Sequence, residues 1–135
     1  MGNVPEHEEK DFYGAVEEIC VKDSRYKPDA YEFVMQALHF TQGKLKRNTH
    51  VTGKELLEGI RELAVEQFGP MAKTVLLHWG ITKTQDFGNI VFNMVNRNIL
   101  SKTDSDSIED FKDVFELDAV FQNILRDSVI KEFKG

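Results

Sequence analysis

Apolar residues recur along most of this chain at intervals of three and four positions, which is the spacing of a helix that buries one face. Polar or glycine-containing breaks separate the segments that carry this pattern. We therefore expect a mainly α-helical protein. The predicted helices cover residues 10–22, 28–43, 54–67, 71–79 and 85–98.

Residues with strong preferences for helix ends mark several of these boundaries. Thr52 precedes Glu55 by three positions, which is the spacing of a capping box, and this pair predicts a helix over 54–67. Pro28 suits the first turn of a helix because the amide hydrogen that it lacks would have no partner there. Gly43 is expected to end the helix that Pro28 begins.

Two segments of the chain follow the same order of residue types. In 26–37 and in 68–81 an aromatic residue stands two positions before a proline, and an alanine stands two positions after it. Each segment joins two predicted helices, at Pro28 and at Pro70. One such helix pair is too small to bury its own apolar face, so two copies packed together would complete one core. We therefore predict an internal duplication of a helical hairpin.

The pattern changes after residue 100. The segments 100–103 and 111–117 flank a polar, acidic stretch, and this arrangement predicts a small C-terminal β-hairpin with an acidic tip. Three apolar residues of the second segment also fit a short helix capped by Ser107, and this alternative stays open.

Three helices followed by two short strands have the order of elements found in a winged helix. In that arrangement 85–98 would be the recognition helix. Asn and Gln side chains can bind adenine edges, so the hypothesis has a chemical basis. The exposed positions of this helix would be Gln85, Asn89, Asn93, Asn96 and Arg97.

A chain of 135 residues is large enough for one domain with a hydrophobic core. We expect residues 1–8 to be a disordered lead-in, because they lack periodicity. Residues 9–117 are expected to form a single duplicated helical domain, and 118–135 a C-terminal amphipathic helix. The predicted fold class is mainly α (α+β), with duplicated helical hairpins and a winged-helix-like C-terminal hairpin.

The net charge of −6 disfavours a general nucleic-acid binder, because contacts to phosphates require a surplus of Lys and Arg. Nucleic acid therefore remains a possible but disfavoured partner. No apolar run reaches the roughly 20 residues that a membrane helix needs, and the acidic N-terminus is unlike a signal peptide. We expect a cytoplasmic protein without a membrane partner.

No sequence motif indicates a catalytic, nucleotide-binding or metal-binding site. The four histidines are scattered, and the single Cys20 cannot form a zinc site from cysteine pairs. Cys20 shares the apolar face of its helix, so we expect an inert core thiol. We therefore expect no catalytic residue, no metal and no cofactor.

Two groups of residues are candidates for contact with a partner. The first lies at the two matching junctions, where aromatic residues are commonly part of the core but Tyr, Trp and Arg also anchor interfaces. The second is a basic loop, which is either simply solvated or binds an anion or an acidic partner. The candidate residues are Arg25, Tyr26, Lys46, Arg47, His50 and Trp79.

Several longer strings resemble a known family, and the resemblance runs from Phe12 to Leu117. The family is an uncharacterised group of small bacterial repeat proteins with no assigned activity. The resemblance implies a bacterial, cytoplasmic repeat protein, and it implies no catalytic residue. The strings are RYKPDAYEFV (25–34), HVTGKELLEGIREL (50–63), FGPMAKTVLLHWGI (68–81), DFGNIVFNMV (86–95) and LSKTDSDS (100–107).

These observations favour a non-enzymatic protein-binding or adaptor module that recognises another protein. One alternative is a winged-helix-like nucleic-acid-binding or regulatory protein that acts through 85–98. The other is an enzyme of unrecognised type, for which a deep pocket with clustered ionisable groups would be the evidence.

Overall fold

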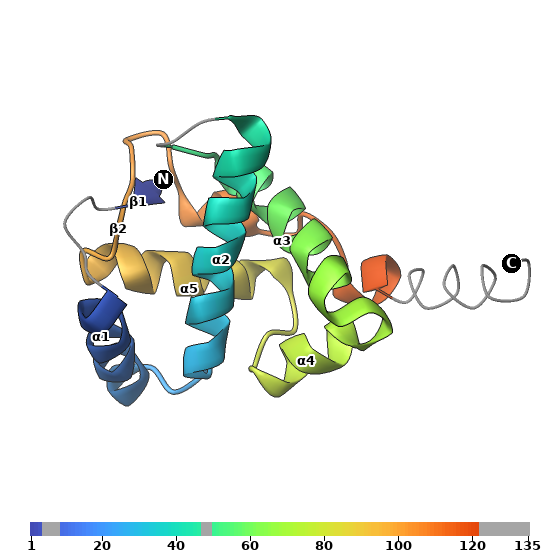
Figure 1. The fold of residues 1–135 in the computed structure, drawn as a ribbon, viewed down its shortest axis with the longest axis horizontal. Helices are drawn as coiled ribbons and strands as arrows, with labels where there is room; N and C mark the ends of the chain where they lie inside the picture. The colour runs from blue at the N-terminus through green and yellow to red at the C-terminus, as the bar shows by residue number, and fades with distance from the viewer. Residues whose placement is uncertain (4–8, 47–49, 122–135) are drawn as a thin grey trace, which may run out of the picture.

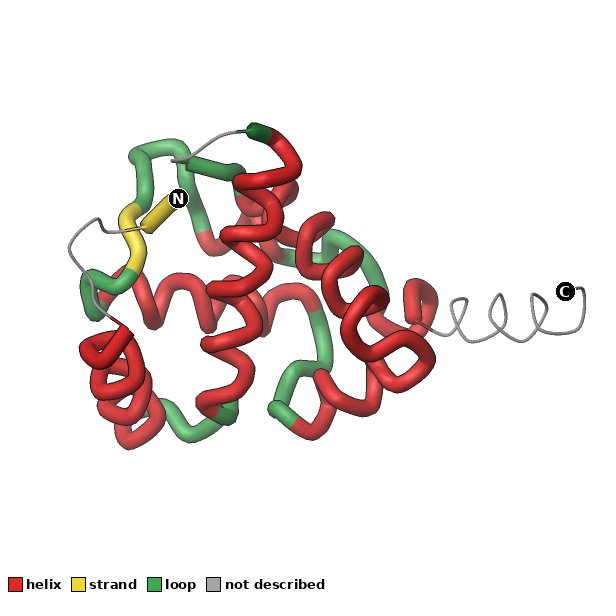
Figure 2. The backbone as a smooth tube through the Cα atoms, in the orientation of Figure 1, coloured by secondary structure: helices red, strands yellow, loops and turns green. Residues whose placement is uncertain are grey.

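A computed structural model describes residues 1–3, 9–46 and 50–121 (Figures 1 and 2). The described part of the chain is mainly helical and contains five complete α-helices, two 3-10 helices and two very short strands. Residues 117–121 begin a further helix. The elements in order are β1 (Gly2–Asn3), α1 (Glu9–Lys22), α2 (Pro28–Leu45), α3 (Gly53–Phe68), η1 (Gly69–Met71), α4 (Ala72–His78), α5 (Thr84–Asn96), β2 (Leu100–Ser101) and η2 (Ile108–Phe111).

The local signals in the sequence mark the helix starts correctly. The Thr52 hydroxyl accepts a hydrogen bond from the Glu55 amide at 3.1 Å, and the Glu55 carboxylate accepts one from the Thr52 amide at 2.8 Å. This confirms the capping box of α3. Pro28 is the first residue of α2. The expected end of α2 at Gly43 is wrong, because the helix continues to Leu45 and ends where Lys46 adopts a left-handed φ of 57°.

Helices α2, α3 and α5 form the centre of the molecule. In Figure 1, α2 crosses in front of α5, α1 lies on one side of this pair, and α3 and α4 lie on the other. Direct packing joins α2 to α3 and to α5. The largest fully buried side chains are Tyr31, Phe87, Phe111, Met1, Leu38, Leu56, Leu57, Ile60, Leu76, Ile81, Ile90 and Met94.

Helices α2 and α3 approach each other closely at Gly59. A Cβ atom at this position would lie 1.8 Å from the Thr41 hydroxyl oxygen. Thr41 is buried, and its hydroxyl donates a hydrogen bond to the Ala37 carbonyl at 2.7 Å. The absence of a side chain at Gly59 therefore permits the central contact between these two helices.

The two predicted hairpins differ in their local geometry. Pro28 begins an α-helix of 18 residues, whereas Pro70 lies in a 3-10 turn that leads into α4, a helix of only 7 residues. Each helix of a pair packs against its neighbour, and α2 also packs against α3. The duplication stays a prediction, because these features fit a repeat without requiring one.

The predicted C-terminal β-hairpin is wrong. Residues 100–101 form β2, but this strand pairs antiparallel with β1, so that Gly2 lies opposite Ser101 and Asn3 opposite Leu100. The region 111–117 contains no strand. Residues 108–111 form the 3-10 helix η2, with Ser107 as its cap, so the alternative of a Ser107-capped helical segment is nearer to the structure.

Tertiary packing explains why residues 108–114 are not a strand. The Phe111 ring packs against two glycines. A Cβ atom at Gly88 would lie 2.9 Å from the nearest atom of Phe111, and a Cβ atom at Gly53 would lie 3.0 Å from the nearest atom of Asp110. The hydroxyl of Thr84 donates a hydrogen bond to the Phe111 carbonyl at 2.7 Å. Contacts with α3 and α5 thus hold this segment in a tight turn.

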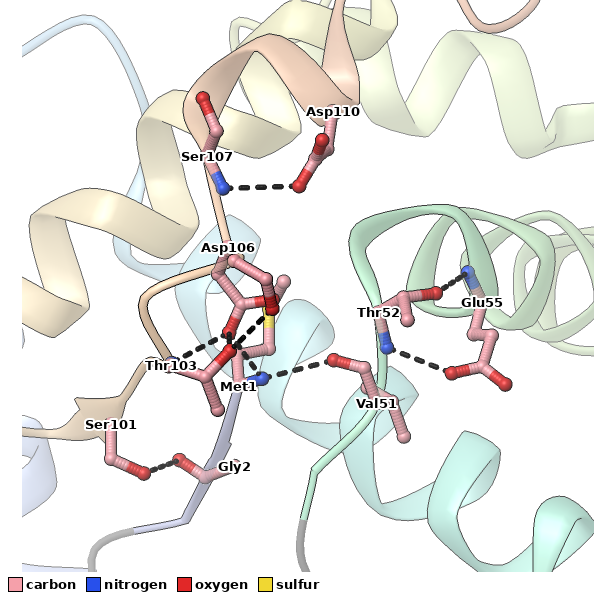
Figure 3. Close-up of polar contacts among 11 residues, drawn as sticks. Met1, Gly2, Val51, Thr52, Glu55, Ser101, Thr103, Asp106, Ser107 and Asp110 are labelled. Carbon is pink, nitrogen blue, oxygen red and sulfur yellow. Dashed lines mark hydrogen bonds and ion pairs between the residues drawn. The ribbon is translucent and has the colours of Figure 1, made fainter.

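The prediction that residues 1–8 are a disordered lead-in is wrong for its first three residues, and residues 4–8 lie outside the described part. Met1 is 2% exposed. Its amino group donates hydrogen bonds to the Val51 carbonyl at 3.0 Å and to the Asp106 carboxylate at 2.8 Å (Figure 3). The N-terminal residues therefore join the loop before α3 to the loop after β2.

Only the first four residues of the predicted helix over 118–135 lie in the described part of the chain. Residues 118–121 are helical, and Phe121 is buried. Lys73 on α4 forms an ion pair with Asp118. The remaining residues of this prediction, 122–135, lie outside the described part of the chain.

Replacing Gly59 with Ala should destabilise the protein by about 1–3 kcal/mol, because the new methyl group would collide with Thr41. Thr41→Ala removes the nearest atom, so the double variant should recover part of the loss. Gly43→Ala is the control, since a Cβ atom there meets nothing within 4 Å, and it should not destabilise α2. Urea unfolding gives the unfolding free energy of the wild type, the two glycine variants and the double variant. Equal losses for Gly59→Ala and Gly43→Ala would contradict the close packing at Gly59.

Asp106→Asn should destabilise the protein by about 1–3 kcal/mol near neutral pH, because it removes a charged partner of the Met1 amino group. Burial alone would raise the pKa of Asp106, but its hydrogen bonds to Met1 and Thr103 lower that pKa below its usual value. The stabilisation is therefore complete above about pH 4 and disappears as the pH falls through the lowered pKa. The difference in unfolding free energy between wild type and variant should shrink as the pH falls through that acidic range, and exposed Asp104→Asn is the control.

Candidate functional site

The two junctions that the sequence analysis singled out lie side by side. The amide of Lys27 donates a hydrogen bond to the Trp79 carbonyl at 3.1 Å. Gly80 has a φ of 94°, and a Cβ atom there would lie 2.1 Å from the Arg25 carbonyl oxygen. A residue without a side chain at Gly80 therefore lets the junction after α4 contact the junction before α2.

Tyr26 is buried, with 3% of its surface exposed, so its side chain belongs to the core and is not available to a partner. Its hydroxyl donates a hydrogen bond to Asp86 at 2.5 Å and accepts one from the Asn89 amide at 3.0 Å. The other oxygen of Asp86 accepts hydrogen bonds from the amides of Thr82 and Lys83 at the start of α5. Burial raises the pKa of Tyr26 to about 12. Tyr26 thus attaches the first junction to α5.

Arg25 is exposed, but its guanidinium group already has partners. It donates two hydrogen bonds to the Asp23 carboxylate, at 2.9 Å and 2.7 Å, and lies 5.2 Å from the centre of the Tyr26 ring. The hydrogen bond from Arg25 holds the pKa of Asp23 well below its usual range. The amide of Asn93 also donates to Asp23 and to the Tyr31 hydroxyl, each at 3.0 Å. The guanidinium group of Arg25 therefore stabilises the junction, and it is already paired within the protein before a partner could bind.

Trp79 packs against two phenylalanine rings at the surface end of the core. Its ring centre lies 5.5 Å from that of Phe33 and 5.6 Å from that of Phe68, and the Trp79 and Phe68 rings meet edge to face at 81°. Phe33 is buried, whereas Phe68 and Trp79 are half-buried. Trp79 therefore combines the two roles that the sequence left open, because one side completes the core and the other remains accessible.

These three rings form part of a groove of about 200 Å³ on the surface, which we call the aromatic groove. It lies between the first turns of α2, the end of α3 and the residue after α4. Gln36 and Gln67 bridge α2 and α3 with a hydrogen bond of 3.3 Å. The groove is lined by Asp29, Glu32, Phe33, Gln36, Gln67, Phe68 and Trp79.

The basic loop lies at the other end of α2 from the aromatic groove. Helix α2 has 18 residues and so is about 27 Å long, and Figure 1 shows its two ends on opposite sides of the molecule. Lys46 and His50 are exposed there, and Arg47 lies outside the described residues. Nearby Lys44 forms an ion pair with Glu62. The structure thus separates the five described candidate residues into two distant groups.

Helix α5 is a central helix, and most of its residues are buried or half-buried. It packs against α1, α2, α3, β2 and η2. Asn89 and Asn93, two of its expected base-reading residues, are half-buried and bind Tyr26, Tyr31 and Asp23, while Arg97 forms an ion pair with Glu18. Helical periodicity placed these asparagines outside the apolar stripe. Periodicity alone does not show whether a polar residue outside that stripe has an internal partner.

The geometry of the described ranges supports neither a reactive cysteine nor a metal site. Burial raises the pKa of the Cys20 thiol, whose sulfur lies 3.6 Å from the Tyr26 carbonyl oxygen, so the reactive thiolate form is disfavoured. Over residues 1–3, 9–46 and 50–121, no group of three or more His, Cys, Asp or Glu side chains is placed to hold a metal ion.

Comparisons of the chain with protein-family models, with curated proteins and with solved structures find no match. The resemblance to small bacterial repeat proteins therefore stays a prediction. In the described segments no helix has both the length and the apolar character needed to cross a bilayer. The chemistry of the two surface regions is thus the basis for a functional hypothesis.

Tyr26→Phe should destabilise the protein by about 1–3 kcal/mol, because it removes the hydrogen-bond partner of one oxygen of the buried Asp86 and a partner of the half-buried Asn89. In the wild-type protein, burial raises the pKa of Tyr26 from the usual 10.0 to about 12. The contribution of Tyr26 is therefore complete below pH 10 and is lost as the pH rises towards 12. Urea unfolding at several alkaline pH values should show a shallower decline for Tyr26→Phe than for the wild type.

The control for this experiment is Tyr13→Phe. Tyr13 is 43% exposed, so its replacement should change the unfolding free energy by no more than about 0.5 kcal/mol. An equal effect of the two substitutions would contradict a special role for the Tyr26 hydroxyl.

Proposed function

We propose that this protein is a non-enzymatic protein-binding module of the adaptor type, and that the aromatic groove is its contact surface. The observation that carries the proposal is the half-buried pair Phe68 and Trp79 at the surface end of the core. Aromatic residues, and Trp above all, are enriched among the residues that dominate binding energy at protein interfaces. A rigid aromatic surface beside polar groups suits that role.

The size of the groove favours a protein segment over a small molecule. Pockets for drug-sized ligands have volumes of about 300–1,000 Å³, and the aromatic groove has about 200 Å³. A groove of this size fits one side chain of a partner, with the surrounding surface in contact with the partner's backbone. Gln36 and Gln67 provide amide groups for such contacts.

The two alternative functions have less support. The asparagines of α5 that would bind bases have internal partners, and the expected hairpin wing is replaced by η2. The carboxylates of Asp29 and Glu32 beside the groove would also repel phosphates. For an enzyme of unrecognised type, the groove offers only the exposed carboxylates of Asp29 and Glu32 as a base or nucleophile, and they lie at an open surface.

Gln36→Trp tests the proposal, because a large ring at this exposed position would cover the groove while leaving the core unchanged. Wild type and variant, tagged at the C-terminus, are expressed in the cell of origin, and the proteins that they capture are quantified. At least one partner of the wild type should fall about tenfold or more with Gln36→Trp, as expected for loss of a binding hot spot.

Asn96→Trp is the matched control, since it adds the same ring at an exposed position at the end of α5. It should capture the partner as well as the wild type does. Circular dichroism and thermal unfolding verify that both variants fold. If no protein is captured reproducibly, or if both variants lose the partner equally, the proposal is overturned.

A further inference from the structure

We infer that the aromatic groove recognises a basic side chain, and specifically that it binds an arginine of the partner protein. This inference rests on the proposed protein-binding function and adds the chemistry of the group that the groove accepts. Two independent features of the groove carry it, which are the sign of its charge and the arrangement of its rings.

The charge of the groove is uniformly negative. Asp29 and Glu32 both line it, both are exposed, and they stand three positions apart in the first turns of α2. Residues at this spacing lie on the same face of a helix. None of the described residues that line the groove is basic. The two carboxylates are not neutralised by a basic residue that lines the groove, so they attract a positive group of a partner.

The hydrogen bond that Glu32 accepts is long and lies at an exposed position. Glu32 accepts a hydrogen bond of 3.2 Å from the exposed Tyr13 hydroxyl through one of its two oxygens. Negative charges are favoured near the N-terminus of a helix, and this accounts for acidic residues at the start of α2 in general. It does not account for their position beside half-exposed aromatic rings, where a cation gains a second interaction.

The rings provide that second interaction. A cation near the face of an aromatic ring is attracted by the negative charge of the π-system, most strongly for Trp. Trp79 and Phe68 are half-buried and meet edge to face, and buried Phe33 holds both in place. Because the rings are packed against one another, little conformational entropy should be lost when a cation binds.

Arginine fits this combination better than lysine. Its planar guanidinium group stacks on an aromatic ring and at the same time donates paired hydrogen bonds to a carboxylate, whereas the compact ammonium of lysine acts as a point charge. The same pairing occurs within the protein, where Arg25 lies over the Tyr26 ring and donates two hydrogen bonds to Asp23. A groove of about 200 Å³ accommodates one such side chain.

The test uses the free protein and three small probes, N-acetyl-arginine amide, N-acetyl-lysine amide and N-acetyl-glutamine amide. The chain contains a single tryptophan, so the indole N–H resonance of Trp79 reports on the groove without ambiguity. The arginine probe should shift this resonance saturably, with a dissociation constant on the order of 1 mM for a ligand of this size. The lysine probe should bind more weakly, and the glutamine probe should have no effect.

The double variant Asp29→Asn/Glu32→Gln should weaken binding of the arginine probe at least about fivefold, because it removes both charges and retains the shape of the groove. The matched control is Asp104→Asn/Glu109→Gln, which makes the same change of charge at exposed positions that do not line the groove. It should bind the probe as the wild type does.

The inference is overturned if the arginine probe leaves the Trp79 resonance unchanged, if the glutamine or lysine probe binds as well, or if both double variants lose the probe equally. The titration needs no partner protein. If the titration fails but the capture experiment succeeds, the groove still binds a partner protein and only the assignment of arginine is overturned. If the capture experiment fails, the protein-binding function itself is overturned.

Discussion

The close approach of α2 and α3 at Gly59 is the constraint on which the rest of the structure depends. Because Gly59 has no side chain, buried Thr41 on α2 fits directly against α3. The two helices then hold Phe33 and Phe68 with their ring centres 5.7 Å apart. Trp79 packs against both rings, so the aromatic groove is a direct consequence of how closely two helices can pack.

Buried polar groups determine how the other elements are placed around α2 and α3. Tyr26 binds Asp86 and Asn89 on α5, and Thr84 binds the carbonyl of Phe111 in η2. Apolar burial is not directional, whereas a buried hydroxyl without a partner has a large energetic cost. These hydrogen bonds therefore select one arrangement of the helices among those that would bury similar apolar area.

The aromatic groove lies where the core reaches the surface. Phe33 is wholly part of the interior, while Phe68 and Trp79 each leave one part of the ring accessible beside Asp29 and Glu32. The proposed role in binding follows from that partial exposure together with the negative charge. The basic loop at the other end of α2 is a separate region, and its positive charge is reduced by the pairing of Lys44 with Glu62.

The sequence by itself determined the helical character and the starts of α2 and α3 at Pro28 and at the Thr52 cap. These features depend on residues within one or two helical turns, so local pattern is sufficient. Only the tertiary structure decided that β2 pairs with β1, that Tyr26 is buried and that Trp79 is half-open. Those outcomes depend on contacts between distant residues, such as Tyr26 with Asp86 at a separation of 60 positions and Met1 with Asp106 at 105, and local periodicity contains no information about which distant groups meet.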